Sequence, residues 1–136
     1  MDDQHPALVA ARNSWRCVQA KDKQGWLELM ADDICMEDPI GVAPPTNPSG
    51  EGMRGKAVLS EFYDKHLAPT TIAIETHESF AAGLESAHVM TLTTSFPNGA
   101  KMSVHGIFTY RVNDAGVLQS LRGYWTLEDS KVEQPS

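Results

Sequence analysis

The chain has 136 residues, of which 41% are hydrophobic and 21% are charged, so the sequence predicts one folded domain over residues 1–136 and excludes a disordered chain. With 11 Lys and Arg residues against 18 Asp and Glu residues, the net charge is −7, which disfavours a nucleic-acid partner. No apolar run approaches the ~20 residues of a membrane span, and the acidic first residues are unlike a signal peptide, so we expect a cytoplasmic protein without membrane contact.

The first part of the chain carries two helical patterns. Pro6 suits the first turn of a helix, and apolar residues then recur at helical spacing through about Ala20. Asp22 can cap a second, short helix that carries Trp26 and extends to Met30.

A strand, a long loop and a third helix follow. Residues 34–38 predict a short strand that Pro39 ends. From there to Gly52 the chain is rich in proline and glycine. A loop of this length inside a domain is uncommon and often functional, and a plain surface excursion is the other interpretation. Residues 56–67 predict the third helix.

The remainder of the chain predicts an antiparallel sheet. Turn signals at residues 97–99 and 113–116 separate its last three strands, and the polar tail over 128–136 is expected to be frayed. Helices placed ahead of such a meander predict an α+β fold with the helices against one sheet face. The strands are expected over residues 70–79, 86–96, 102–112 and 117–127.

Both faces of the predicted sheet carry apolar and aromatic residues. In the strand over 102–112, Val104, Phe108 and Tyr110 alternate with residues that include Ile107. The helices can cover only one face. The open face, to which we assign Ile107 and Leu118, predicts a two-fold homodimer, because it would otherwise expose an apolar patch.

Cysteines and histidines give no sign of a disulfide framework or a metal site. Cys17 and Cys35 are too few for a disulfide scaffold and are expected to be buried free thiols. The five histidines are scattered without the spacing of metal ligands. We therefore expect neither a metal nor another cofactor.

Asp38 is the strongest candidate for a chemical role. It shares a strand face with Ile34 and Met36, whereas Glu37 points the other way. If this face is inward, desolvation raises the pKa of the carboxyl and makes it a usable proton acceptor near neutral pH. An Asp before Pro at the end of a strand is also a common turn signal, so the pattern alone leaves both interpretations open.

Three segments resemble bacterial ketosteroid isomerases. Residues 30–41, with the run Glu-Asp-Pro-Ile-Gly, resemble the segment around the catalytic base of that family. Residues 54–63 are similar to the helix that follows it, and residues 112–125, with the closing Tyr-Trp, resemble the last hairpin. The resemblance covers about residues 8–127. It implies a cone-shaped fold of the nuclear transport factor 2-like superfamily, which also includes cyclases, dehydratases, epoxide hydrolases and non-enzymes.

The resemblance implies a proton-shuttle role for Asp38. It would take a proton beside a ketone of a steroid-like molecule and return it at another carbon, which shifts a double bond into conjugation without a cofactor. Ser14 stands where the family has an oxyanion-binding tyrosine, and Phe108 where it has a protonated aspartic acid. Losing one such donor costs about 2.7–4 kcal/mol of transition-state stabilisation, so we expect slow turnover. Tyr63, at the position of a supporting tyrosine, is expected to supply a hydroxyl together with Ser14 or the Trp125 N–H; a helix residue with its hydroxyl at the surface is the other interpretation.

Matching this sequence position by position to the family pattern also outlines a mostly apolar pocket. Such a pocket suits a flat molecule with one or two oxygens. Trp15 and Trp26, at helical spacing, are expected to be core residues instead. The predicted lining residues are Val18, Met30, Phe62, Val89, Thr91, Thr93, Val104, Gly106, Phe108, Leu121, Gly123 and Trp125.

Two functions from different classes remain open at this point. An isomerase of the steroid delta-isomerase type is favoured by the expected burial of Asp38. A non-catalytic binding protein for a steroid or a similar hydrophobic molecule is favoured by the two replaced donors, Ser14 and Phe108. A lyase or hydrolase of the same fold is the third alternative.

Overall fold

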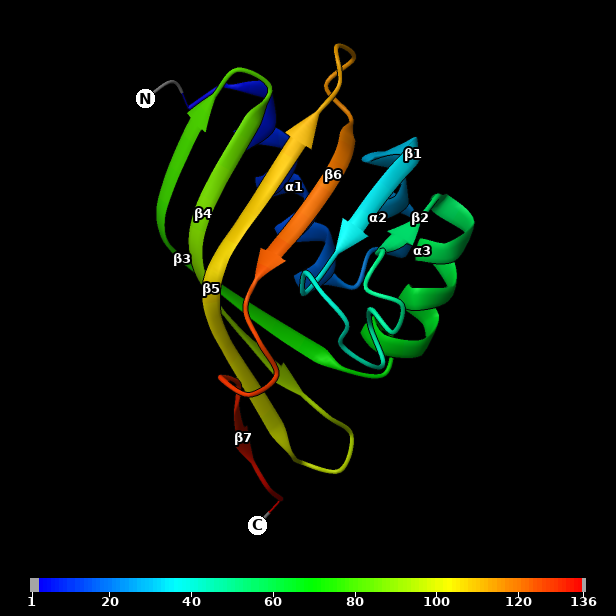
Figure 1. Ribbon diagram of the computed structural model, residues 1–136, viewed down its shortest axis with the longest axis vertical. Helices are drawn as coiled ribbons and strands as arrows, with labels where there is room; N and C mark the ends of the chain where they lie inside the picture. Colours follow the sequence, from blue (N-terminus) through cyan, green and yellow to red (C-terminus); the bar gives the residue numbers. More distant parts are fainter. Residues whose placement is uncertain (1–2, 136) are drawn as a thin grey trace.

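The computed structural model describes residues 3–135 as three α-helices and a curved, open sheet of seven strands (Figure 1). The first two helices lie across the concave side of the sheet and the third lies beside β1 and β2 at one edge, which confirms the predicted α+β cone. β1 runs parallel to β6, and the other strand pairs are antiparallel. Along the sheet the order is β2 (Met53–Arg54), β1 (Met30–Glu37), β6 (Leu118–Tyr124), β5 (Lys101–Val112), β4 (Glu85–Ser95) and β3 (Thr71–Ala82), and β7 (Lys131–Glu133) pairs with the start of β5.

Capping residues set the limits of the first two helices. α1 (Pro6–Ala20) has the predicted bounds and ends where Lys21 adopts a left-handed conformation. α2 (Lys23–Glu28) begins as predicted, with the Asp22 carboxylate accepting from the Gly25 N–H at 2.9 Å. The prediction that this helix extends to Met30 is wrong, because Met30 pairs with Leu118 in the parallel ladder and opens β1.

The third helix changes its winding halfway. α3 (Lys56–Phe62) continues as η1 (Tyr63–Leu67), a π-helical turn, so the predicted helix over 56–67 is present with a wider last turn. The three helices and the concave face of the sheet enclose one hydrophobic core. Its most deeply buried side chains are Leu8, Trp26, Ile34, Leu59, Met90, Phe108, Val112 and Leu118.

The hairpin between β4 and β5 fixes which face of β4 lines the cone. A two-residue turn at 98–99 would pair Val89 with Phe108. The structure instead has a three-residue loop, closed by the Phe96 N–H donating to the Ala100 carbonyl at 2.8 Å, and His88 pairs with Phe108. Directly paired residues lie on the same face, so the even-numbered residues of β4 face inward.

The predicted pocket residues Val89, Thr91 and Thr93 therefore lie on the convex face, and their assignment to the lining is wrong. There the Thr91 hydroxyl is hydrogen-bonded to His77 at 2.9 Å and to His105 at 2.8 Å.

A β-bulge corrects a second prediction of this kind. The register of β5 against β6 shifts so that Arg111 pairs with Ser120 but Val112 pairs with Leu118, which leaves Gln119 as the extra residue. This shift turns Leu118 into the core, where its side chain has no exposed surface. Leu118 is thus not part of the open sheet face.

The polar tail is only partly as predicted. β6 ends at Tyr124, which frees the edge of β5 over 101–103, and β7 pairs with that edge. The expectation of a frayed tail is therefore wrong for Lys131–Glu133, and Ser136 lies outside the described residues. Both cysteines are free, as predicted, but only Cys17 is buried and Cys35 is half-buried. None of the helices in the described part of the chain is long and apolar enough to cross a membrane.

Candidate active site

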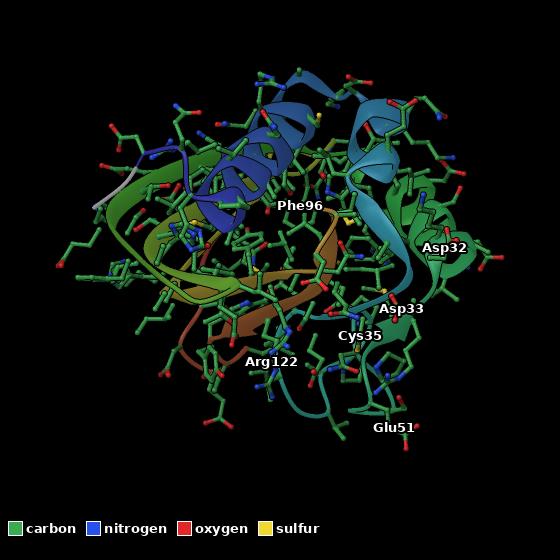
Figure 2. All side chains as sticks on the ribbon, turned by 90° about the horizontal axis from the view of Figure 1, so that it is seen from above. Asp32, Asp33, Cys35, Glu51, Phe96 and Arg122 are labelled. Atoms are coloured by element: carbon green, nitrogen blue, oxygen red, sulfur yellow. The ribbon has the colours of Figure 1, made fainter. Side chains whose placement is uncertain are left out.

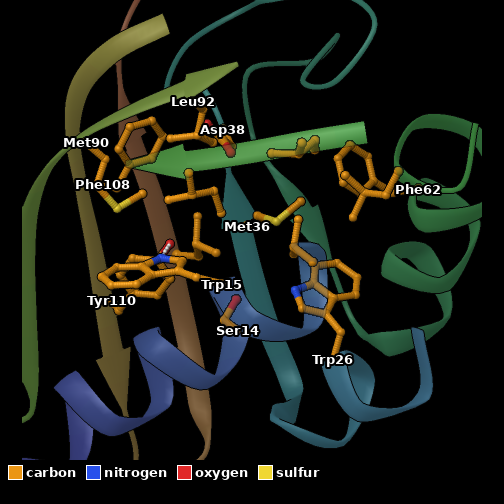
Figure 3. Close-up of a pocket in the computed structure, with 15 residues that line it drawn as sticks. Ser14, Trp15, Trp26, Met36, Asp38, Phe62, Met90, Leu92, Phe108 and Tyr110 are labelled. Atoms are coloured by element: carbon orange, nitrogen blue, oxygen red, sulfur yellow. Dashed lines mark hydrogen bonds between the residues drawn. The ribbon is translucent and has the colours of Figure 1, made fainter. Parts of the chain in front are cut away.

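Two adjoining cavities lie between the concave sheet face and the helices, with volumes of about 70 Å³ and 250 Å³. We call the first the inner cavity, since buried residues such as Ser14, Phe108 and Tyr110 line it (Figure 3). The second is the outer cavity, because exposed residues such as Leu127 line it. Both are mostly apolar and form one tapered pocket, since they share Asp38, Phe62, Leu67, Ile72 and Leu92.

Asp38 lies where the two cavities meet, directly after the end of β1. Ile34 and Met36, on the same strand face, are buried in the core, so this face is inward. The neighbouring residues Cys35 and Arg122 lie outside the cone, on the side away from α1 (Figure 2). The alternation seen in the sequence therefore places the Asp38 carboxyl inside the pocket.

The electrostatics of Asp38 are set by burial and by one hydrogen bond. Burial among apolar side chains raises the pKa of the carboxyl above its usual value, although one edge of the residue borders the pocket. Trp125 Nε1 donates to Oδ1 at 2.6 Å and acts in the opposite direction, because it stabilises the carboxylate. The resulting carboxyl is fixed in place and shifted toward neutral pH, which suits a group that takes and returns a proton.

Two glycines make room for this arrangement. A Cβ atom on Gly123 would collide with Oδ1 of Asp38 and crowd the Phe108 ring and the Trp125 indole nitrogen. A Cβ on Gly106 would collide with the backbone where β6 ends and the chain turns toward Trp125. Both were predicted to line the pocket. In the structure neither glycine lines a cavity. Their lack of a side chain instead leaves room for the residues packed beside the pocket.

The loop over 39–52 is held against the site by a buried asparagine. Asn47 donates through Nδ2 to the Pro39 carbonyl, and its Oδ1 accepts from the Gly52 N–H, both at 2.9 Å. Thr46 donates its hydroxyl to the Asp38 carbonyl at 2.9 Å. These bonds fix the backbone around Asp38, and the loop contributes Pro44, Pro45 and Thr46 to the outer cavity.

Ser14 and Phe108, the two departures from the ketosteroid isomerase pattern, both line the inner cavity. Phe108 lies close to the Asp38 carboxyl, because a Cβ atom on Gly123 would crowd both side chains. The chain therefore has an apolar ring where the family pattern has a carboxylic acid. Val18, Phe62, Val104, Leu121 and Trp125 also line the pocket at the predicted positions.

Tyr63 and Met30 lie outside both cavities. Tyr63 is buried against Trp26, with ring centroids 5.8 Å apart. Burial, and then the carboxylate of Asp22, raise the pKa of its phenol. Neighbouring helix residues point about 100° apart, and it is Phe62 that faces the pocket. Tyr63 is not placed to donate a hydrogen bond to a ligand there. Met30 is part of the hydrophobic core.

The sequence interpretation missed Trp15 and Tyr110, which line the inner cavity. Trp15 Nε1 donates to the Tyr110 hydroxyl oxygen at 2.8 Å. The alternation of residues along β5 already placed Tyr110 on the same face as Phe108. This alternation could have identified Tyr110 as a lining residue. Trp26 also lines the inner cavity rather than serving only as core.

A neutral histidine supports this pair from behind. His88 is buried between the hydroxyls of Ser79 and Ser86, each 2.7 Å from a ring nitrogen. Burial, and to a lesser extent Arg12, lower the pKa of His88 to about 4, so the ring is neutral at pH 7. Its ring packs edge-on against Trp15, with centroids 4.8 Å apart. Within residues 3–135, no group of three or more His, Cys, Asp or Glu side chains could hold a metal ion.

Comparison with known proteins places this site in a family. The profile of the SnoaL-like domain matches residues 11–119. A Δ5-3-ketosteroid isomerase from Mycobacterium sp. is 48% identical and superposes with a TM-score of 0.92. The match covers 95% of this chain and 99% of the isomerase chain.

Two further structures are similar over nearly the whole chain. A Mycobacterium tuberculosis protein in complex with estradiol-17beta-hemisuccinate is 46% identical over 94% of this chain and 99% of its own, with a TM-score of 0.90. A computationally designed binder of 17-OHP is 44% identical, and the match covers 96% of this chain and 100% of the binder, with a TM-score of 0.93. The chain therefore belongs to the SnoaL-like domain family of the nuclear transport factor 2-like superfamily, among its ketosteroid isomerase-like members.

Proposed function

We propose that this protein binds a steroid-like apolar ketone in the tapered pocket and shifts one of its double bonds by proton transfer through Asp38. The observation that carries the proposal is the carboxyl of Asp38, buried among apolar side chains where the two cavities meet. A protein that only holds an apolar ligand gains nothing from burying an ionisable group, since its desolvation costs stability.

Protons and electrons balance within the substrate and Asp38. The carboxylate takes a proton from the carbon beside the ketone, and the electrons of that C–H bond form a carbon–carbon double bond while the carbonyl π electrons move to the oxygen. The protonated carboxyl returns the proton to the far carbon of the dienolate, which restores the carbonyl in conjugation with the shifted double bond. The Trp125 hydrogen bond fixes the carboxyl in the pocket, where it is to serve both carbons in turn.

The relatives support this choice of substrate class. The isomerase from Mycobacterium sp. acts, by its name, on Δ5-3-ketosteroids, and the Mycobacterium tuberculosis protein binds a steroid ester. The mostly apolar lining fits a fused-ring molecule, whose burial contributes ~25 cal/mol per Å². We expect micromolar binding of a Δ5-3-ketosteroid after the costs of association.

A second candidate function is binding without efficient turnover. It is favoured by Phe108, an apolar ring that cannot stabilise an enolate, and by Ser14, a poorer donor than a phenol. Two of the similar structures hold or were designed to hold a steroid-like ligand. On this ground we expect the isomerisation to be slow.

The test follows the absorbance of the conjugated enone with wild type, Asp38→Asn and the matched control Glu37→Gln, an equivalent substitution on the adjacent residue. Asp38→Asn should lower turnover by ~10²-fold or more, because an amide cannot accept the proton. Glu37→Gln should keep it, since Glu37 faces away from the pocket and pairs with Arg122 at 3.2 Å. Turnover that is undiminished in Asp38→Asn contradicts proton transfer through Asp38. Steroid binding without wild-type turnover supports the second function.

A further inference from the structure

The inner end of the pocket contains a phenol, Tyr110, to which the resemblance to ketosteroid isomerases assigned no role. Tyr110 lies two residues beyond Phe108 on β5 and faces the inner cavity. Only 4% of its surface is exposed, and Trp15, Ser14 and Phe108 line the same cavity. Figure 3 shows its hydroxyl meeting the Trp15 indole beside the cavity.

The hydrogen bond from Trp15 decides what the Tyr110 hydroxyl can do. The indole N–H can only donate, so at 2.8 Å it occupies a lone pair of the phenol oxygen. The hydroxyl proton remains available, and among the described residues no acceptor for it is recorded. A buried O–H without an acceptor costs about 1–3 kcal/mol, so a ligand oxygen that accepts it gains affinity.

The surroundings keep this phenol protonated and in one position. Burial raises the pKa of Tyr110 well above its usual value, the Trp15 hydrogen bond opposes this shift, and the Asp38 carboxylate adds to it. His88 packs on both members of the Trp15–Tyr110 pair and is itself held by two serine hydroxyls. The Tyr110 hydroxyl is therefore held in place by the packing of His88, and it faces the mostly apolar inner cavity.

We propose that Tyr110, positioned by Trp15, donates the hydrogen bond that holds the carbonyl oxygen of the ligand at the inner end of the pocket. The inference rests on the proposed function and narrows its substrate class to flat, apolar molecules whose ketone lies on the end that enters first. During turnover, the oxygen that gains the carbonyl π electrons accepts a shorter bond from Tyr110. The phenol keeps its proton, and Asp38 alone exchanges one with carbon.

This assignment makes Tyr110 a catalytic residue and Trp15 a positioning residue. It also gives the chain a donor in place of the two that Ser14 and Phe108 replace. Ser14 is the rival, because its hydroxyl lines the same cavity. Tyr110 is the better donor to a developing negative charge, because the hydrogen bond from Trp15 holds the phenol in place and polarises its O–H group.

The test uses a steroid 4-en-3-one as probe, because its ultraviolet absorption moves to longer wavelength when the carbonyl oxygen accepts a strong hydrogen bond. A matched steroid without the 3-oxygen reports apolar binding alone. Wild type should shift the enone spectrum, and Tyr110→Phe should remove most of the shift and weaken enone binding ~10-fold. Binding of the deoxy steroid should stay within about twofold, since the ring and its packing remain.

Two further variants separate the roles. Ser14→Ala should leave the shift intact, and Trp15→Phe should reduce it while the deoxy steroid still binds. If turnover is measurable, Tyr110→Phe should lower kcat by ~10²-fold or more.

The outcomes separate this inference from the proposed function. A shift that persists in Tyr110→Phe, or is lost in Ser14→Ala instead, overturns the Tyr110 assignment whether or not the protein turns over substrate. A shift lost in Tyr110→Phe without any wild-type turnover supports the assignment and overturns the isomerase. A wild type that binds the enone with no shift overturns the assignment, and one that binds neither steroid overturns both proposals.

Discussion

At the scale of single residues, Asp38 combines a proposed chemical role with a cost in stability. Its pKa is higher in the folded chain than in the unfolded one, where it lies near 3.8. The folded protein therefore binds this proton more tightly, and the free energy of unfolding falls as the pH rises through the folded pKa. Near neutral pH the ionised carboxylate destabilises the fold.

Asp38→Asn should consequently stabilise the protein at pH 7 by roughly 0.5–2 kcal/mol, because the amide has no charge to desolvate and can still accept from Trp125. The gain should shrink as the pH falls toward 4. Urea unfolding at both pH values measures it, with Glu37→Gln as the control. A variant that is less stable than wild type at pH 7, or a gain that is independent of pH, contradicts the burial argument.

At the scale of elements, the loop over 39–52 and its anchor Asn47 determine how firmly Asp38 is held. Asn47→Ala removes two hydrogen bonds and leaves the Pro39 carbonyl and the Gly52 N–H unpaired. Each unpaired buried group costs about 1–3 kcal/mol, so we expect a loss of roughly 2–4 kcal/mol in the free energy of unfolding.

Asn98→Ala serves as the control for the loop, since that asparagine makes one bond, to the Ala100 N–H, in an exposed turn. It should cost under about 1 kcal/mol. Turnover should fall with Asn47→Ala and not with Asn98→Ala. Urea unfolding and the enone assay measure both effects, and equal losses in the two variants would mean that the loop does not anchor the site.

The elements also show what sequence reasoning could and could not reach. Helix periodicity, caps and turn signals predicted most of the elements, and alternation placed Asp38 on the inward face. Alternation could not choose the inward face of β4, because one extra residue in the 97–99 loop reverses it. The bulge at Gln119 reversed Leu118 in the same way. Tyr110 was missed because its importance depends on Trp15, a residue 95 positions away in the sequence.

At the scale of the whole molecule, the convex face of the sheet remains the proposed dimer surface. Ile107, Phe80 and Tyr124 are each about half exposed or more, at 46%, 59% and 49%. The prediction rests on Ile107 and its neighbours, since Leu118 belongs to the core. A second copy of the chain would cover this apolar surface.

Sedimentation velocity should show a dimer for wild type at micromolar concentration and a monomer for Ile107→Glu, because a buried carboxylate opposes association. Val58→Glu is the control, since Val58 is exposed on α3, away from the sheet. A monomeric wild type, or an Ile107→Glu variant that stays dimeric, contradicts this surface.

The central claim is that one sheltered carboxyl, Asp38, carries a proton between two carbons of an apolar ketone. The most direct measurement supplies a Δ5-3-ketosteroid with deuterium on the carbon beside the ketone, in ordinary water, and locates the deuterium in the product by mass spectrometry. We predict that most of it reappears on the distal carbon, because a carboxyl buried among apolar side chains exchanges slowly with solvent. A product that carries only solvent protons, or the same transfer in Asp38→Asn, would contradict the account.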